Sequence, residues 1–159
     1  MKIKFLCIDQ STKITGYSVW ENKELINYGI VESDSKEKKP IERMYQMYFK
    51  IKDLIENINP NFVTIEGVQF QNNYKTYSQL SQMQGIILSL LFERNIGFII
   101  IEPTAWKAFC SIKGRKRIEQ KSNTIQMVKD KFGLELSEDI CDSIGIGLWT
   151  INNVKETIK

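Results

Sequence analysis

Residues 3–20 read IKFLCIDQSTKITGYSVW, and this stretch predicts the centre of the fold. An apolar run ends in Asp9, a short polar segment follows, and residues 14–20 return to an apolar strand pattern. Residues 24–31 continue the series after a polar turn, so the pattern predicts a meander of three antiparallel strands. Alternation places Asp9 on the same face as Phe5 and Cys7, toward the interior, where an unpaired carboxylate is costly.

Helices and two further strands are expected after the three antiparallel strands. Apolar residues recur at three- and four-residue spacing over 38–58 and about 76–94, which predicts two amphipathic helices. Short apolar strands follow at 62–65 and 98–101, and strands flanked by helices are typically parallel and covered on both faces. Further helices are expected over 103–110, 118–132 and about 137–154. The sequence therefore predicts an α/β fold: a mixed five-stranded sheet, three antiparallel strands plus two parallel, with helices on both faces.

Length and composition narrow the possible functions. The 159 residues suit one domain, so residues 1–159 are expected to fold as a single unit. The absence of histidine removes Ser-His-Asp and Cys-His catalysis and histidine-based zinc sites, and three scattered cysteines argue against a disulfide framework. No run approaches the ~20 apolar residues of a membrane span, and the start reads as a strand. We therefore expect a cytoplasmic protein with no membrane partner.

Four acidic residues lie at the ends of apolar strands or in an otherwise apolar helix, where burying a charged side chain is costly. Asp9 and Glu66 each end an apolar strand, and Asp139 and Asp142 share a face in the first turn of a predicted helix. That helix is otherwise apolar nearly all round and must be buried, with Gly145 and Gly147 allowing close backbone approach.

Each acid has an ordinary alternative. Asp9 is compatible with a turn residue, Glu66 with a strand terminator, and Asp139, like Glu138, with the positive end of a helix dipole. The ordinary alternatives explain the four acids less well as a group. If the predicted helix and strands pack on the first strand, all four acids come to one edge of the sheet. Crowded carboxylates raise one another's pKa, and a divalent cation relieves that repulsion. Oxygen ligands without histidine or thiolate favour Mg²⁺ or Mn²⁺.

A basic segment occupies residues 107–131. It contains eight cationic residues against Glu119 and Asp130 and suits a polyanion such as nucleic acid, although a solvated helix face with a basic loop explains it equally well. The cationic residues are Lys107, Lys113, Arg115, Lys116, Arg117, Lys121, Lys129 and Lys131.

Three ordered motifs resemble the RuvC family of Holliday-junction resolvases. IDQSTKITGYSV at residues 8–19 resembles the family's first strand and hairpin, and IEGV at 65–68 its second acidic strand. DICDSIGI at 139–146 resembles its final D-x-x-D helix. The intervals also fit, so the resemblance covers nearly the whole chain. Gln10-Ser11 replaces the family's frequent Pro-Gly, and residues 69–73 are unusually polar, which resembles divergent phage-type members.

The resemblance implies a ribonuclease-H-like nuclease domain, a homodimer and hydrolysis with two Mg²⁺ ions per active site, for which Mn²⁺ would substitute. Asp9, Glu66, Asp139 and Asp142 would bind the metal, and the central strand position of Asp9 makes it the best candidate to bridge both ions. Lys107 and Lys121 would act catalytically near the scissile phosphate. The expected DNA-binding residues are Lys107, Lys113, Arg115, Lys116, Arg117 and Lys121, together with Phe70 and Tyr74. Either aromatic ring could equally serve packing.

The expected reaction is hydrolysis of phosphodiesters in four-way junctions and other branched DNA, leaving 5′-phosphate and 3′-hydroxyl ends, in a bacterial cell or a phage-infected host. The apolar helix near residues 80–91 is the candidate dimer interface, or else is wholly internal. A related nuclease acting on structured RNA would use the same acids. A branched-DNA-binding protein that does not cut would gain nothing from anions facing phosphate. An actin-like or sugar-kinase ATPase needs two such domains, and this chain is too short.

Overall fold

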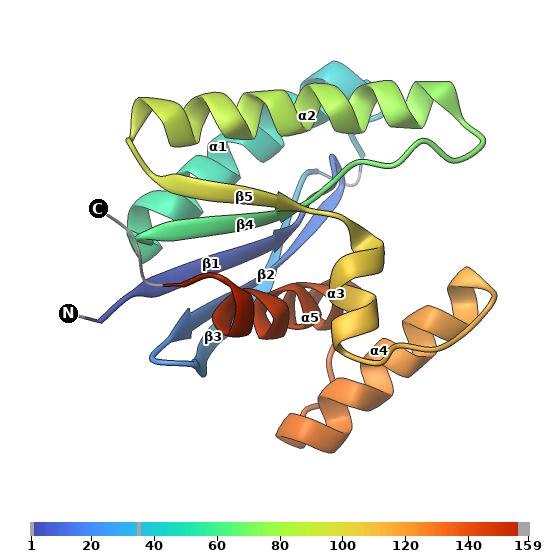
Figure 1. The fold of residues 1–159 in the computed structure, drawn as a ribbon. Helices are drawn as coiled ribbons and strands as arrows, with labels where there is room; N and C mark the ends of the chain where they lie inside the picture. Colours follow the sequence, from blue (N-terminus) through green and yellow to red (C-terminus); the bar gives the residue numbers. More distant parts are fainter. Residues whose placement is uncertain (1, 35, 156–159) are drawn as a thin grey trace.

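A mixed sheet forms the middle layer of the molecule (Figure 1). The computed structural model describes residues 2–34 and 36–155. The strands are β1 (Lys4–Asp9), β2 (Ile14–Glu21), β3 (Glu24–Glu32), β4 (Phe62–Glu66) and β5 (Gly97–Ile101). The helices are α1 (Pro40–Ile58), α2 (Tyr74–Glu93), α3 (Pro103–Phe109), α4 (Arg117–Phe132) and α5 (Glu138–Asn153).

The strand order is β3-β2-β1-β4-β5, so β1 is the central strand. It pairs antiparallel with β2 and parallel with β4, and β4 pairs parallel with β5. The expected mixed five-stranded sheet is therefore confirmed. Because parallel strands end at the same edge, β1 and β4 bring their last residues, Asp9 and Glu66, to one side of the molecule.

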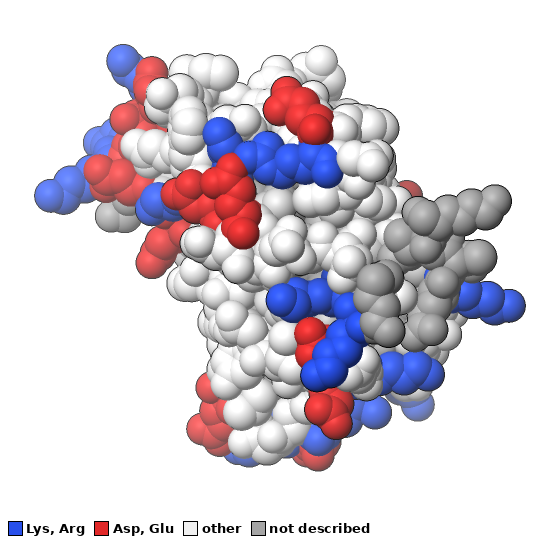
Figure 2. All heavy atoms as spheres, turned by 90° about the vertical axis from the view of Figure 1, so that its left-hand side faces the viewer, with Lys and Arg blue, Asp and Glu red and all other residues white. Residues whose placement is uncertain are grey.

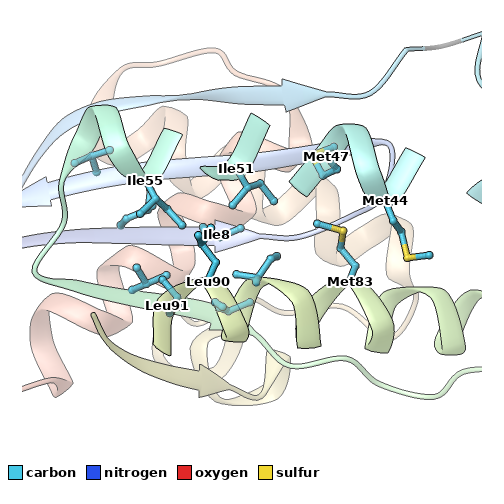
Figure 3. Packing of buried hydrophobic residues seen from close by; sticks show 13 residues of the cluster. Ile8, Met44, Met47, Ile51, Ile55, Met83, Leu90 and Leu91 are labelled. Carbon is cyan, nitrogen blue, oxygen red and sulfur yellow. The ribbon is translucent and has the colours of Figure 1, made fainter. Parts of the chain in front are cut away.

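Helices cover both faces of the sheet, as expected. In Figure 1, α1 and α2 lie above the sheet and α3, α4 and α5 below it. The upper core joins residues such as Ile8, Ile51 and Leu90, which interdigitate between α1, α2 and the sheet (Figure 3). The lower core packs α5 and its neighbours on Phe5, Cys7 and Trp20. Side-chain alternation along β1 therefore supplies both cores and leaves Asp9 on the α5 side.

Helix α2 contributes its apolar face to the subunit's own interior. The upper core buries its apolar residues Met83, Ile87, Leu90 and Leu91. Of the two expectations for this helix, dimer interface or interior, these residues follow the second. The helix also begins earlier than expected, because the Asn73 side chain accepts a hydrogen bond from the Thr76 backbone N–H and caps it. Tyr74, expected in the preceding loop, is consequently the first residue of α2. None of the described helices is long and apolar enough to cross a bilayer.

Helix α5 lies unusually close to β2, and two glycines permit this. A Cβ on Gly16 would lie 2.0 Å from the carbonyl oxygen of Asp139, and one on Gly147 would lie 1.9 Å from Nε1 of Trp20. Between these points the Ser18 hydroxyl donates a 2.7 Å hydrogen bond to the carbonyl of Ser143. The sequence predicted close approach at Gly147 but gave no sign that Gly16 is the point of backbone contact.

Replacing Gly16 with alanine tests this packing. The added methyl group would force the first turn of α5 off the sheet, so we expect Gly16→Ala to lower the free energy of unfolding by about 1–3 kcal/mol. Gly85→Ala is the matched control, because Gly85 lies within α2 and a Cβ there would meet nothing within 4 Å. The control should gain about 0.5–1 kcal/mol from helix propensity. Equal stability of the two variants in urea denaturation would contradict the proposed contact.

Candidate active site

Asp9 and Glu66 are neighbours at the carboxyl end of the sheet. Ile8 of β1 lies opposite Ile65 of β4 in the parallel ladder, so the next residue of each strand is one of the two acids. The carboxyl groups of Asp9 and Glu66 approach closely enough to hydrogen-bond. Both side chains retain partial exposure, so the edge is open to solvent.

The first turn of α5 adds Asp139 and Asp142. Gly16 lies opposite Asp9 in the β1–β2 ladder, and the backbone of Asp139 rests directly on Gly16. The contact that seats α5 therefore also places its acidic turn beside the end of β1. Asp142 follows three residues later on the same face of the helix.

The pKa values show that the four carboxyl groups share one electrostatic environment. Burial raises the pKa of Asp9 well above its ordinary value, and the charges of Glu66, Asp142 and Asp139 raise it further. Burial and the neighbouring Glu66 likewise raise the pKa of Asp142 to about 7. Burial and Glu138 raise the pKa of Asp139. The structure therefore brings the four predicted acids together, at an electrostatic cost.

The donor set fits a hard divalent cation. All four groups offer carboxylate oxygens, which Mg²⁺ and Mn²⁺ prefer, and a cation would remove the repulsion that raises these pKa values. Within the described part of the chain, no three acidic or cysteine side chains are close enough to enclose an ion in their present conformations. All three cysteines are free, and burial raises the pKa of each.

Several hydrogen bonds fix the end of β4. The indole N–H of Trp106 donates to Oε1 of Glu66 at 2.8 Å, and the Gln84 side chain donates to the Glu66 carbonyl at 3.0 Å. The Gly67 N–H donates to the Ile101 carbonyl at 2.8 Å. Neither Trp106 nor Gln84 was among the predicted site residues, because their helical periodicity marks them only as members of a helix.

Lys107 and Lys121 lie beside the acids, as the sequence suggested. The charge of each lowers the pKa of Asp142 against the larger effects of burial and Glu66. The Lys107 ammonium donates to the Gln120 side chain at 3.2 Å, and Lys121 forms a 2.5 Å ion pair with Glu138. Both cations therefore lie within electrostatic reach of Asp142, and Lys121 is held there by its ion pair with Glu138.

The remaining basic residues surround the α3–α4 loop. Lys113, Arg115, Lys116 and Arg117 are all exposed there and are not among the groups that shift the carboxyl pKa values. Arg117, the first residue of α4, donates a 3.5 Å hydrogen bond to Gln71 of the β4–α2 loop. The α3–α4 and β4–α2 loops lie at the same end of the sheet (Figure 1). The opposite end intersperses Lys and Arg with Asp and Glu (Figure 2).

The two aromatic residues of the predicted DNA-binding set are exposed. Phe70 lies in the β4–α2 loop, is 61% exposed and packs edge-on against Tyr77 at a centroid distance of 5.6 Å. Tyr74 is 74% exposed at the start of α2. Neither ring is used in the core, which leaves their proposed contact with DNA as a prediction.

Comparisons with known proteins identify the family of this chain. Residues 1–152 match a family described as Lactococcus phage M3 protein. A crossover junction endodeoxyribonuclease RuvC from Fusobacterium nucleatum is 30% identical over 96% of this chain and 82% of its own length. The chain belongs to the Lactococcus phage M3 family and to the RuvC family of crossover junction endodeoxyribonucleases. The RuvC of Caldicellulosiruptor saccharolyticus is 29% identical over 92% of this chain and 90% of its own.

Solved structures agree on the fold. RuvC of T. thermophilus, in complex with a Holliday junction substrate, aligns with a TM-score of 0.73 at 16% identity, covering 95% of this chain and 97% of its own. The yeast mitochondrial Holliday junction resolvase Ydc2 aligns with a TM-score of 0.61 at 16% identity, covering 91% and 75%. The ribonuclease-H-like fold and the resemblance to RuvC are therefore confirmed.

The raised pKa of Asp142 predicts how stability depends on pH without metal. Between its ordinary value of 3.8 and about 7, the folded state holds a proton that the unfolded state has lost. The free energy of unfolding should therefore fall as pH rises through this range. Asp142→Asn cannot ionise, so at pH 8 in EDTA it should melt above wild type, by roughly 2–4 °C per kcal/mol of repulsion removed.

The control is Asp53→Asn, which changes an exposed carboxylate on α1. It should melt with wild type at every pH, and adding Mg²⁺ should raise the melting temperature of wild type more than that of Asp142→Asn. If Asp142→Asn melts below wild type in EDTA at pH 8, the repulsion described above is absent.

Proposed function

We propose that this chain is a divalent-metal-dependent endonuclease that cuts four-way junctions and other branched DNA, leaving 5′-phosphate and 3′-hydroxyl ends. The observation that carries the proposal is the meeting of Asp9, Glu66, Asp139 and Asp142 at one sheet edge, with two lysines beside them. Relatives named as crossover junction endodeoxyribonucleases cover most of the chain, which supports branched DNA as the substrate.

Mg²⁺ is the proposed metal, two ions per site, with Mn²⁺ as a substitute. Asp9 is the best placed of the acids to contact both ions, because it ends the central strand and is influenced by all three other acids. Glu66 would complete the shell from β4, and Asp139 and Asp142 from α5. Bound there, the metal supplies an activated water and stabilises the charge on the leaving oxygen.

The chain's own residues would hold the DNA and offset charge. Lys107 and Lys121 would face the scissile phosphate, where a positioned cation stabilises the extra negative charge of the transition state. Lys113, Arg115, Lys116 and Arg117 would contact the backbone of the junction arms, which makes binding fall with salt. Phe70 and Tyr74 would contact unstacked bases, since both rings are exposed at the same end of the molecule.

A homodimer would allow paired nicks across a four-way junction. Since the apolar face of α2 is internal, we propose its outer face as the contact between subunits. Ser81, Ser89 and Phe92 are exposed on that face, where the small side chains of the two serines would let two helices approach closely and Phe92 would supply apolar contact. The proposed location is the cytoplasm of a bacterial cell or a phage-infected host.

Asp9→Asn tests the proposed chemistry. We expect it to bind a synthetic four-way DNA junction as tightly as wild type but to nick it at least about 10²–10³-fold more slowly in Mg²⁺, because the central metal ligand is weakened. Asp53→Asn, on the exposed side of α1, should bind and nick like wild type. Nicking products are resolved on a denaturing gel, with the 5′ ends tested for phosphate.

The same assay separates the alternatives. Faster cleavage of a structured RNA than of the DNA junction would reassign the substrate. Junction binding by wild type without any cleavage in Mg²⁺ or Mn²⁺ would make the protein a binder. Undiminished nicking by Asp9→Asn would remove the carboxylates from the reaction.

A further inference from the structure

Trp106 is a buried residue that contacts the acidic site from outside the predicted set. It lies in α3 with no exposed surface, and its indole N–H donates to Oε1 of Glu66 at 2.8 Å. Hydrogen bonds to ionised carboxylates are roughly twice as strong as those between neutral groups. The Asp9 carboxyl group, itself one of the four acids, also lies within hydrogen-bonding reach of this carboxylate. Trp106 is thus the donor from outside the set of four acids that fixes one oxygen of Glu66.

The ring of Trp106 also contacts α5. A Cβ on Gly145 would lie 2.4 Å from Cζ3 of the indole, so the ring packs directly on the helix backbone three residues beyond Asp142. The Lys107 ammonium stands 5.5 Å from the centroid of the same ring. One rigid side chain therefore touches the strand that ends in Glu66, the helix that carries Asp142, and a lysine of the site.

We propose that Trp106 is a positioning residue that sets the orientation of Glu66, and its spacing from the acidic turn of α5, for cation binding. The inference rests on the proposed function. A carboxylate already held in one orientation loses less conformational freedom when a cation binds. Partners that orient a metal ligand in this way typically contribute 10–100-fold to metal affinity.

Trp20 provides an internal comparison. It is also buried, its N–H donates to the Ser18 hydroxyl at 2.9 Å, and its ring packs against Gly147 two residues further along α5. The two tryptophans thus make the same kind of packing contact with the same helix, but only Trp106 bonds a proposed metal ligand. A purely structural role for Trp106 predicts that the two positions respond alike to loss of the indole N–H.

The experiment measures Mn²⁺ affinity by electron paramagnetic resonance in wild type, Trp106→Phe and Trp20→Phe. We expect Trp106→Phe to bind Mn²⁺ about 10–100-fold more weakly, while Trp20→Phe stays within about twofold of wild type. Junction nicking by Trp106→Phe should also need a correspondingly higher Mg²⁺ concentration for half-maximal rate. Equal Mn²⁺ affinity in the two variants would overturn the proposal.

A second substitution keeps the test decisive if Trp106→Phe does not fold. Replacing Trp106 site-specifically with 3-benzothienyl-alanine exchanges the N–H for sulfur and keeps the shape of the ring. We expect native-like melting with the same loss of Mn²⁺ affinity, and unchanged affinity would contradict the positioning role. The wild-type protein distinguishes failure of the proposed function from failure of the positioning role. If wild type neither binds Mn²⁺ nor nicks the junction, the proposed function is wrong. If wild type does both and the Trp106 variants behave like it, only the role of Trp106 is wrong.

Discussion

The seating of α5 on β2 is the contact on which the rest of the site depends. At Gly16 the sheet has no side chain, so the backbone of Asp139 rests on the strand itself, beside the end of β1. The Ser18–Ser143 hydrogen bond continues this contact along the helix. The packing that completes the lower core thereby also brings Asp139 and Asp142 to the end of the sheet. The same packing of α5 on β2 therefore stabilises the fold and positions the acidic site.

That arrangement destabilises the chain without metal. Four carboxyl groups crowd one edge, and burial with mutual repulsion raises the pKa of Asp9 and Asp142. Natural folds keep such clusters where function needs them, and a cation is the simplest means of offsetting the repulsion. The nearby lysines lower the pKa of Asp142 only in part, which leaves negative charge for a metal to neutralise. A DNA phosphate would then approach a site whose negative charge the bound metal has reduced.

Local pattern predicted much of this molecule, since each of its strands and helices has a clear period. The strands end within one residue of the expected positions near Asp9 and Glu66, where the change from apolar to polar sequence is sharp. Asp9 and Glu66 were found because each ends an apolar strand, and Asp139 and Asp142 because they share the first turn of an otherwise apolar helix. Contacts between distant elements were not predictable, since no local period encodes them: Gly16 against Asp139, and Trp106 against Glu66. The start of α2 was placed too late because the Asn73 cap depends on side-chain geometry.

The most direct measurement is a crystal structure of wild type grown with Mn²⁺, using anomalous scattering to locate the metal. The account predicts two anomalous peaks at the carboxyl end of β1 and β4, ligated by Asp9 and Glu66 and by at least one of the α5 aspartates. Manganese bound elsewhere, with these carboxylates turned to solvent and ligating nothing, would contradict it.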